Sequence, residues 1–194
     1  MKEAVAQAFE ESARVKVAFV REHGDTLLRV AEHLVRVFRQ GGKVLLFGNG
    51  GSATDASHIA GEMVNRFQVE RPGLPAIALA TDMAVLTSIG NDASFEDVFA
   101  RQIEALGQPQ DMAVAISTSG NSANVLRAVE AARRKGLVTV GLTGGDGGRL
   151  AAMVQWALVV PSTSVPRIQE THITIGHVLC DLVDRMLFPQ AGGR

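Results

Sequence analysis

The chain has 194 residues, with 19 Lys and Arg against 20 Asp and Glu, so its formal net charge is -1. A net charge so close to zero gives no general attraction to nucleic acid or to an anionic membrane, and we expect neither as a partner. A chain of this length buries roughly 70% of its unfolded surface, so it needs no disulfide or structural metal to fold. No apolar stretch approaches the ~18 residues that a membrane span requires.

One cysteine, Cys180, is present. A single cysteine excludes an intramolecular disulfide and is typical of the reducing cytoplasm. Glu3, Glu10 and Glu11 interrupt any apolar core of a signal peptide, which favours the same compartment. Hydrophobic residues nevertheless make up 46% of the chain. We expect this excess to be buried at subunit interfaces.

The first forty residues carry no strand signal, and their apolar residues recur at helical spacing. We predict two helices with a break at residues 23–25, where Gly24 ends the first and Asp25 caps the second. Gly41-Gly42 ends this region. The pattern predicts an N-terminal helical region over 1–40, used for oligomerisation, and an α/β domain over 41–194.

From Lys43 onward, short apolar runs alternate with longer amphipathic segments. Runs without polar alternation are typical of strands covered on both faces, and the segments between them are long enough for crossover helices. The sequence thus predicts a doubly wound, five-stranded parallel sheet, followed by a helix from Pro166 to about Leu187 that is apolar on more than one face. The predicted strands are 44–47, 76–79, 113–116, 138–142 and 157–160, and the predicted crossover segments are 52–66, 82–105 and 122–134.

Two loops follow predicted strands at the edge where parallel sheets bind ligands. In residues 48–52 three glycines let the backbone approach a ligand at the start of a helix. Residues 117–122 supply four hydroxyls at a similar turn, which suits a phosphate monoester. Either loop alone is explained by ordinary turn and capping chemistry. Capping one helix needs a single hydroxyl, however, so the two loops together favour binding.

A dinucleotide site is the rival interpretation of the first loop, because Gly48-x-Gly50-x-x-Ala53 matches the Rossmann fingerprint. The acidic partner of the ribose should lie at the end of the second strand, whereas Glu70 precedes that strand and Asp82 follows it late. The serine-rich loop is also left unexplained. We therefore expect no nucleotide cofactor.

Charged and polar residues occur at matched spacing on two helices. His58 and Glu62 lie about 40° apart on one helix face, where they could share a metal or a proton or form an ordinary exposed pair. On the last helix Gln169 and His177 lie about 80° apart and can converge on one site. His172 falls about 140° from His177, which favours a structural role. Asn91-Asp92 is equally consistent with a helix cap and a binding site.

These residues together resemble the phosphoheptose isomerases of the sugar isomerase (SIS) domain superfamily, over essentially the whole chain. The resemblance rests on the glycine loop, His58-x-x-x-Glu62, Arg71-Pro72-Gly73-x-Pro75-Ala76, Gly90-Asn91-Asp92, residues 116–124, the segment 142–148, and Arg167-Ile168-Gln169-Glu170 with His172 and His177. It implies that 41–194 is an SIS domain. It also implies an enzyme converting D-sedoheptulose 7-phosphate into D-glycero-D-manno-heptose 7-phosphate, the first step toward the heptose of bacterial lipopolysaccharide and surface polysaccharide, in a cytoplasmic homotetramer with sites between subunits.

The resemblance also implies roles for individual residues. Glu62 and His177 match the catalytic base and its acid/base partner, and His58, Glu62, Gln169 and His177 match a zinc site with one ion per subunit. The residues that match substrate-binding positions are Asn49, Gly50, Gly51, Ser52, Glu62, Asn91, Asp92, Ser117, Thr118, Ser119, Ser122 and Gln169. An enediol mechanism agrees with this set, because it needs a carboxylate base and a group that moves protons between sugar oxygens.

A non-enzymatic SIS-domain protein that associates with the bacterial replication initiator is also similar to this chain. That similarity includes Asn65-Arg66-Phe67, Cys180-Asp181-Leu182 and Leu187-Phe188-Pro189. The relative lacks the base and the histidine, whereas Glu62 and His177 are both present here. The sequence therefore favours the enzyme over the scaffold protein.

Overall fold

Five parallel strands form one sheet in the order β2-β1-β3-β4-β5. The computed structural model describes residues 1–189, so residues 190–194 of the predicted domain 41–194 lie outside the described part. The strands confirm the five apolar runs of the sequence to within two residues at each end. They are β1 (Val44–Gly48), β2 (Ala76–Ala78), β3 (Met112–Ile116), β4 (Val138–Gly144) and β5 (Trp156–Val160).

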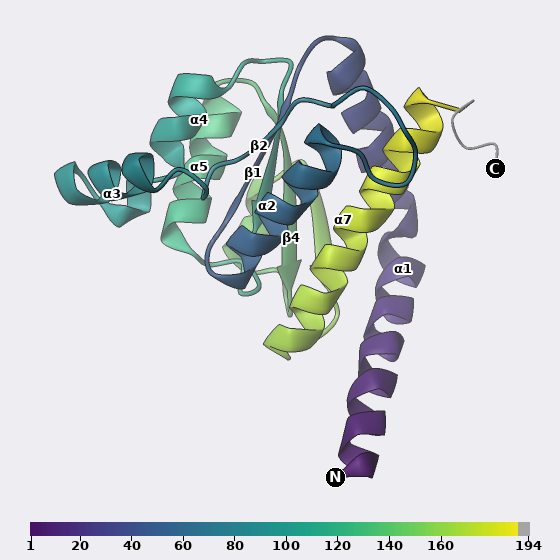
Figure 1. Ribbon diagram of the computed structural model, residues 1–194. Coiled ribbons are helices and arrows are strands. Elements are labelled where there is room, and N and C mark those ends of the chain that lie inside the picture. The colour runs from purple at the N-terminus through teal and green to yellow at the C-terminus, as the bar shows by residue number, and fades with distance from the viewer. Residues whose placement is uncertain (190–194) are drawn as a thin grey trace.

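Helices cover both faces of the sheet, which is why β1 and β3 are buried at every residue (Figure 1). On one face lie α1 (Lys2–Arg39), α2 (Gly51–Val64) and α7 (Val165–Leu187). On the other face lie α4 (Ala100–Leu106), α5 (Ala123–Arg134) and α6 (Gly148–Met153). Each face has its own apolar core, so the predicted doubly wound α/β fold is confirmed.

The predicted break at residues 23–25 is wrong, because α1 runs through it as one helix. A glycine inside a helix costs only about 1 kcal/mol, which packing readily offsets. Phe19 and His23 stack with ring centroids 5.2 Å apart across one turn. The buried stripe continues through Leu27, Val30 and Leu34 without a change of phase. Continuous burial along the helix therefore overrides the local stop signal.

The segment 82–105, predicted as crossover helix, forms α3 (Met83–Asp92), a 3-10 turn η1 (Phe95–Asp97) and α4. Asp82 accepts from the Val85 N–H at the start of α3, and Ser94 accepts from the Glu96 N–H at the start of η1. Because these side chains bind nearby backbone N–H groups, a new helical segment begins at each of these points and one continuous helix does not form.

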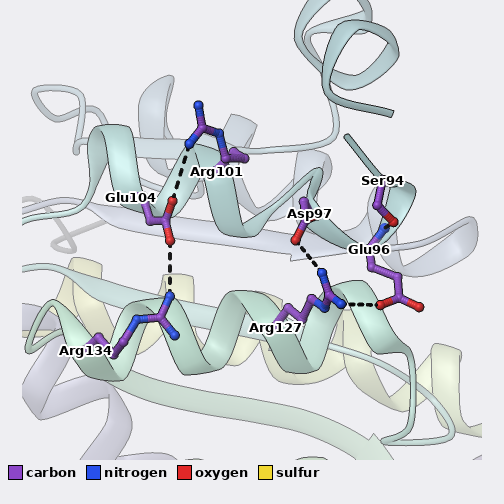
Figure 2. A network of polar contacts seen from close by, with 7 residues as sticks. All are labelled: Ser94, Glu96, Asp97, Arg101, Glu104, Arg127 and Arg134. Atoms are coloured by element: carbon purple, nitrogen blue, oxygen red, sulfur yellow. Dashed lines mark hydrogen bonds and ion pairs between the residues drawn. The ribbon is translucent and has the colours of Figure 1, made fainter. Parts of the chain in front are cut away.

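Exposed ion pairs join η1 and α4 to α5 (Figure 2). Arg127 contacts Asp97 at 2.7 Å and Glu96 at 2.9 Å, and Arg134 contacts Glu104 at 3.1 Å. Such exposed pairs are worth about 0.2–1 kcal/mol each, so burial in the core contributes far more to this layer.

Among residues 1–189, no helix combines the length and the apolar character needed to cross a membrane.

We predict that Gly24→Ala stabilises the protein, because the position is helical and an added Cβ meets only Val20 Cγ2, at 3.7 Å. The free energy of unfolding should rise by about 0.5–1 kcal/mol, measured from urea unfolding midpoints. The control is Gly41→Ala, where space is open but φ is +75°. That variant should be destabilised, and equal effects of the two changes would contradict the continuous helix.

Candidate active site

The direction of winding reverses between β1 and β3, which are neighbours in the sheet. The helix after β1, α2, packs on one face, and the helix after β3, α5, packs on the other. Gly48 and Ile116 are paired at the ends of these strands, so the two loops that follow start side by side. Ligands of open parallel sheets bind in the crevice at such a point. The glycine loop 48–52 and the serine loop 117–122, as we call them below, are these two loops.

The glycine loop is shaped by close approaches that only glycine permits. A Cβ on Gly48 would meet the Ile116 carbonyl oxygen at 2.6 Å, and a Cβ on Gly51 would overlap the carboxamide of Gln169. Gly50, the N-cap of α2, has φ 54°. The glycines therefore let α7 bring the Gln169 side chain directly against the start of α2.

The serine loop keeps its hydroxyls free of helix capping. Ser122 is the N-cap residue of α5 but makes no side-chain capping bond, and its Oγ lies 3.1 Å from Ser117 Oγ. The Gly144 N–H donates to the Thr118 carbonyl at 3.1 Å and docks the loop on β4. The hydroxyls of Ser117 and Ser122 thus meet at the start of α5, where the helix N–H groups favour an anion.

A pair of amides ties the two loops together. Asn49 and Asn124 each donate from Nδ2 to the other's Oδ1, both at 2.8 Å. Asn124 lies in the first turn of α5 and is 3% exposed. The role of Asn124 was not predicted, because it depends on a partner 75 residues away. An amide among the apolar residues of that turn was the one local signal.

Three of the predicted site residues meet between α2 and α7. His58 Nε2 lies 3.2 Å from Glu62 Oε1 and 3.0 Å from His177 Nε2. Ligand atoms of all three residues lie within 4.8 Å of one another. The ring of Phe67 stacks on His177 with centroids 5.5 Å apart. Three of the four predicted metal ligands therefore lie together, whereas Gln169 lies against Gly51 at the start of α2.

The approach of α2 to α7 depends on Gly176, which precedes His177. A Cβ at Gly176 would overlap the side chain of Ile59, the residue after His58. The absent side chain lets the two helix backbones come close enough for the imidazoles to meet. Beside them lies an open groove of about 550 Å³, lined by Thr54, Ser57, His58, Gly61, Glu62 and Asn65.

The remaining predicted positions divide into two groups. Asn49, Gly50, Gly51, Ser52, Ser117, Thr118, Ser119, Ser122 and Gln169 belong to, or contact, the two loops at the crevice. Asn91 and Asp92 end α3 as exposed residues, with Asn91 donating to Asp92 at 2.8 Å. Figure 1 shows α3 on the far side of the molecule from α7. Asn91 and Asp92 therefore lie on a helix apart from α7, which carries Gln169 and His177.

Two other titratable groups near these helices are buried. His172 is 0% exposed, and its ring Nε2 bonds to the Thr143 carbonyl at 3.1 Å. Burial lowers the pKa of His172 to about 4, so the ring is neutral, in agreement with the structural role predicted for it. Burial raises the pKa of Cys180 to about 12, which makes its thiol a poor nucleophile.

Asp55 lies one turn before His58 on α2 and was not singled out by the sequence analysis. Burial raises the pKa of its carboxyl group, and the nearby His58 opposes this shift. Its Oδ2 has no hydrogen-bond partner among residues 1–189. Because Asp55 has the same chemical character as many helix-surface acids, only its burial in the fold distinguishes it.

Known proteins resemble this chain over nearly its whole length. The family described as SIS domain matches residues 8–144. The phosphoheptose isomerase of Thermodesulfovibrio yellowstonii is 55% identical, covering 95% of this chain and 92% of the relative. That of Aquifex aeolicus is 51% identical, covering 96% and 98%. The solved phosphoheptose isomerase of Neisseria gonorrhoeae is 44% identical with a TM-score of 0.89, covering 94% and 98%.

We predict that His172 makes stability depend on pH between about 4 and 6.5. Its pKa is near 4 in the fold and 6.5 in the unfolded chain, so the unfolded chain alone takes up the proton in this window. Stability is complete above pH 6.5 and falls by up to ~3 kcal/mol as the pH drops to 4. Urea unfolding across this range measures the slope.

The matched variant is His172→Gln, because a glutamine amide can still donate to the Thr143 carbonyl but does not titrate. This variant should show a shallower fall in stability over the same range. If the wild type and the variant had the same slope, the assignment of a neutral buried histidine would be wrong.

Proposed function

The chain belongs to the SIS-domain family and, within it, to the phosphoheptose isomerases, and from this membership we propose that it converts D-sedoheptulose 7-phosphate into D-glycero-D-manno-heptose 7-phosphate. The protein is thus an enzyme of the aldose-ketose isomerase class. The product is a heptose phosphate, and the reaction is the first step of heptose synthesis for bacterial lipopolysaccharide and surface polysaccharide. The observation that carries the proposal is the meeting of Glu62 with His58 and His177 between α2 and α7.

Isomerisation moves one proton between C1 and C2 and leaves the overall oxidation state of the sugar unchanged. Glu62 takes a proton from C1 while His177 protonates the C2 carbonyl oxygen, which gives a 1,2-enediol. His177 then removes the proton from the C1 hydroxyl, and Glu62 returns a proton to C2. The His58 ring, 3.2 Å from Glu62 Oε1, holds the carboxylate in place between the two helices.

Substrate recognition uses the two loops of the crevice. Ser117, Thr118, Ser119 and Ser122 would bind the phosphate with the N–H groups at the start of α5. Asn49, Gly50, Gly51, Ser52 and Gln169 would contact the sugar. With a formal net charge of -1, the protein attracts an anionic sugar phosphate through these local donors and not through a global field.

A zinc ion is part of the proposal because the donor set suits it. His58 and His177 present Nε2 atoms 3.0 Å apart, and a Glu62 oxygen lies 3.2 Å from one of them. Two imidazoles and a carboxylate are ordinary zinc ligands. Gln169 is the fourth ligand that the family resemblance implies, and within one chain its carboxamide lies against Gly51, two helical turns before His58. When bound, a divalent ion would polarise the carbonyl and hydroxyl oxygens of the sugar.

We also propose a cytoplasmic homotetramer with sites between subunits. Large apolar side chains are exposed along α1 and at the start of α3, including Val5, Phe9, Val17, Val20, Leu28 and Met83. Contact with another subunit would cover them, as at other homo-oligomer interfaces. In this assembly Asn91 and Asp92, which are exposed at the end of α3, would reach a site of another subunit. The lone, buried Cys180 is consistent with a reducing compartment.

The scaffold protein that associates with a replication initiator is not favoured. It is distinguished from the enzyme by the loss of the base and the histidine. In this chain both are present and lie together with His58. A protein acting through its surface alone has no need to bring three such groups together.

We predict that the wild type isomerises sedoheptulose 7-phosphate and that Glu62→Gln lowers kcat by about 10²- to 10⁴-fold, because the amide cannot accept the C1 proton. KM should change little, since Gln has the same shape as Glu. Steady-state kinetics on folded, tetrameric protein provide the measurement. Near wild-type kcat in Glu62→Gln would overturn the role of Glu62, and a wild type without turnover would overturn the proposed reaction.

We predict one zinc ion per subunit in metal-replete protein, measured by elemental analysis. His58→Gln should lower the zinc content, because it removes one of the imidazole ligands. The matched control is His33→Gln, which removes a histidine that lies on α1 and bonds to Arg36, and its zinc content should equal that of the wild type. Wild-type protein without stoichiometric metal, and with activity insensitive to chelators, would contradict the zinc site.

A further inference from the structure

Arg71 is a buried charge that the proposed chemistry does not use. It lies in the connection between α2 and β2, and its side chain is 0% exposed. Its guanidinium pairs with Asp184 of α7, whose side chain is 4% exposed. The ring of Phe188 covers the guanidinium carbon at 5.9 Å from the ring centroid. Burial of both charges makes this pair costly to form and hard to break.

The remaining donors of Arg71 bind the end of α2. Its Nη2 donates to the carbonyl of Glu62 at 2.9 Å. Its Nη1 donates to the carbonyls of Met63 at 2.9 Å and Pro72 at 3.1 Å. The planar fork of arginine can bind a carboxylate and several carbonyls at once, whereas the single ammonium of lysine cannot match that geometry. One side chain thus connects the last turn of α2 to α7.

These contacts lie next to the reacting groups on both helices. Glu62, whose carbonyl accepts from Arg71, is the residue that we propose as the base. Asp184 follows His177 by seven residues, which is about two helical turns and places both on one face of α7. The Arg71–Asp184 pair therefore fixes how far α2 can slide or rotate against α7 close to Glu62 and His177.

Stability alone gives no reason for the pair. Replacing a buried ion pair by apolar side chains of similar volume is often neutral or stabilising. The surrounding core is apolar and includes Met63, whose carbonyl accepts from Arg71, and Val183, which precedes Asp184. We propose that Arg71, held by Asp184, is a positioning residue that sets the separation of Glu62 and His177. The inference rests on the proposed function, because the catalytic roles of these two residues come from it.

The test compares two variants of the pair with a control. Arg71→Met/Asp184→Leu removes both charges, and Arg71→Lys keeps the charge but not the fork. The control is Lys43→Met, which breaks the pair of Lys43 with buried Asp111, 2.6 Å long and located just before β1 and β3. Melting temperature, kcat, KM and a crystal structure are determined for each.

Both Arg71 variants should lose about 10- to 100-fold in kcat with KM changed less than ~3-fold, because misplacing reacting groups by about 1 Å has costs of this size. In their crystal structures the Nε2 atoms of His58 and His177, 3.0 Å apart in the wild type, should move out of hydrogen-bond reach. Lys43→Met should lower the melting temperature and leave kcat and this distance unchanged.

The inference is overturned if a folded Arg71 variant keeps the wild-type kcat and the wild-type distance, or if Lys43→Met lowers kcat equally. A wild type that does not isomerise the sugar phosphate would instead reject the proposed function. In that case the distance between the two imidazoles in the variant structures still decides whether Arg71 positions the helices.

Discussion

The close approach of α2 and α7 is the constraint on which the rest of the site depends. Gly176 lets Ile59 pack against the backbone of α7. As a result His177, which follows Gly176, meets His58, which precedes Ile59. A side chain at Gly176 would separate the helices at this point. The group formed by His58, Glu62 and His177 is thus a consequence of backbone packing and of the Arg71 contacts at the end of α2.

The sheet makes the second contribution by placing two loops at one crevice. Because winding reverses between β1 and β3, the glycine loop and the serine loop leave neighbouring strands toward opposite faces. The Asn49–Asn124 pair joins them, so a ligand that contacts one loop meets a fixed partner in the other. The helix pair supplies groups that move protons, and the loop pair supplies donors for an anion. A sugar phosphate needs both.

The sequence predicted those parts of the structure whose signals are local. Helices cover both faces of strands β1 and β3, so every residue of these strands is buried. Their uninterrupted apolar runs were therefore sufficient to predict them from the sequence. His58 and Glu62 were found from helical spacing alone. Gly24 led to the wrong prediction of a helix break, because a glycine has little effect where apolar residues continue at helical spacing on both sides of it. Asn124, Arg71 and Gly176 could not be assigned, because each acts through a residue more than eight positions away that only the fold brings near.

The high hydrophobic content of the chain is also explained by the proposed assembly. The hydrophobic fraction of 46% is high for a chain with two ordinary cores, and part of it lies exposed on α1 and α3. In the proposed tetramer these faces would be covered, and the exposed Asn91 and Asp92 would contribute to a site of another subunit. Oligomer formation and completion of the site are then one event.

The central claim is that a carboxylate and an imidazole between α2 and α7 move a proton between two carbons of a sugar phosphate. Incubation of the protein with sedoheptulose 7-phosphate in D₂O, followed by NMR, tests it most directly. The account predicts a heptose 7-phosphate product that carries solvent deuterium at C2, because the proton on Glu62 exchanges with water. Absence of turnover, or a heptose product with no solvent deuterium at C2, would contradict it.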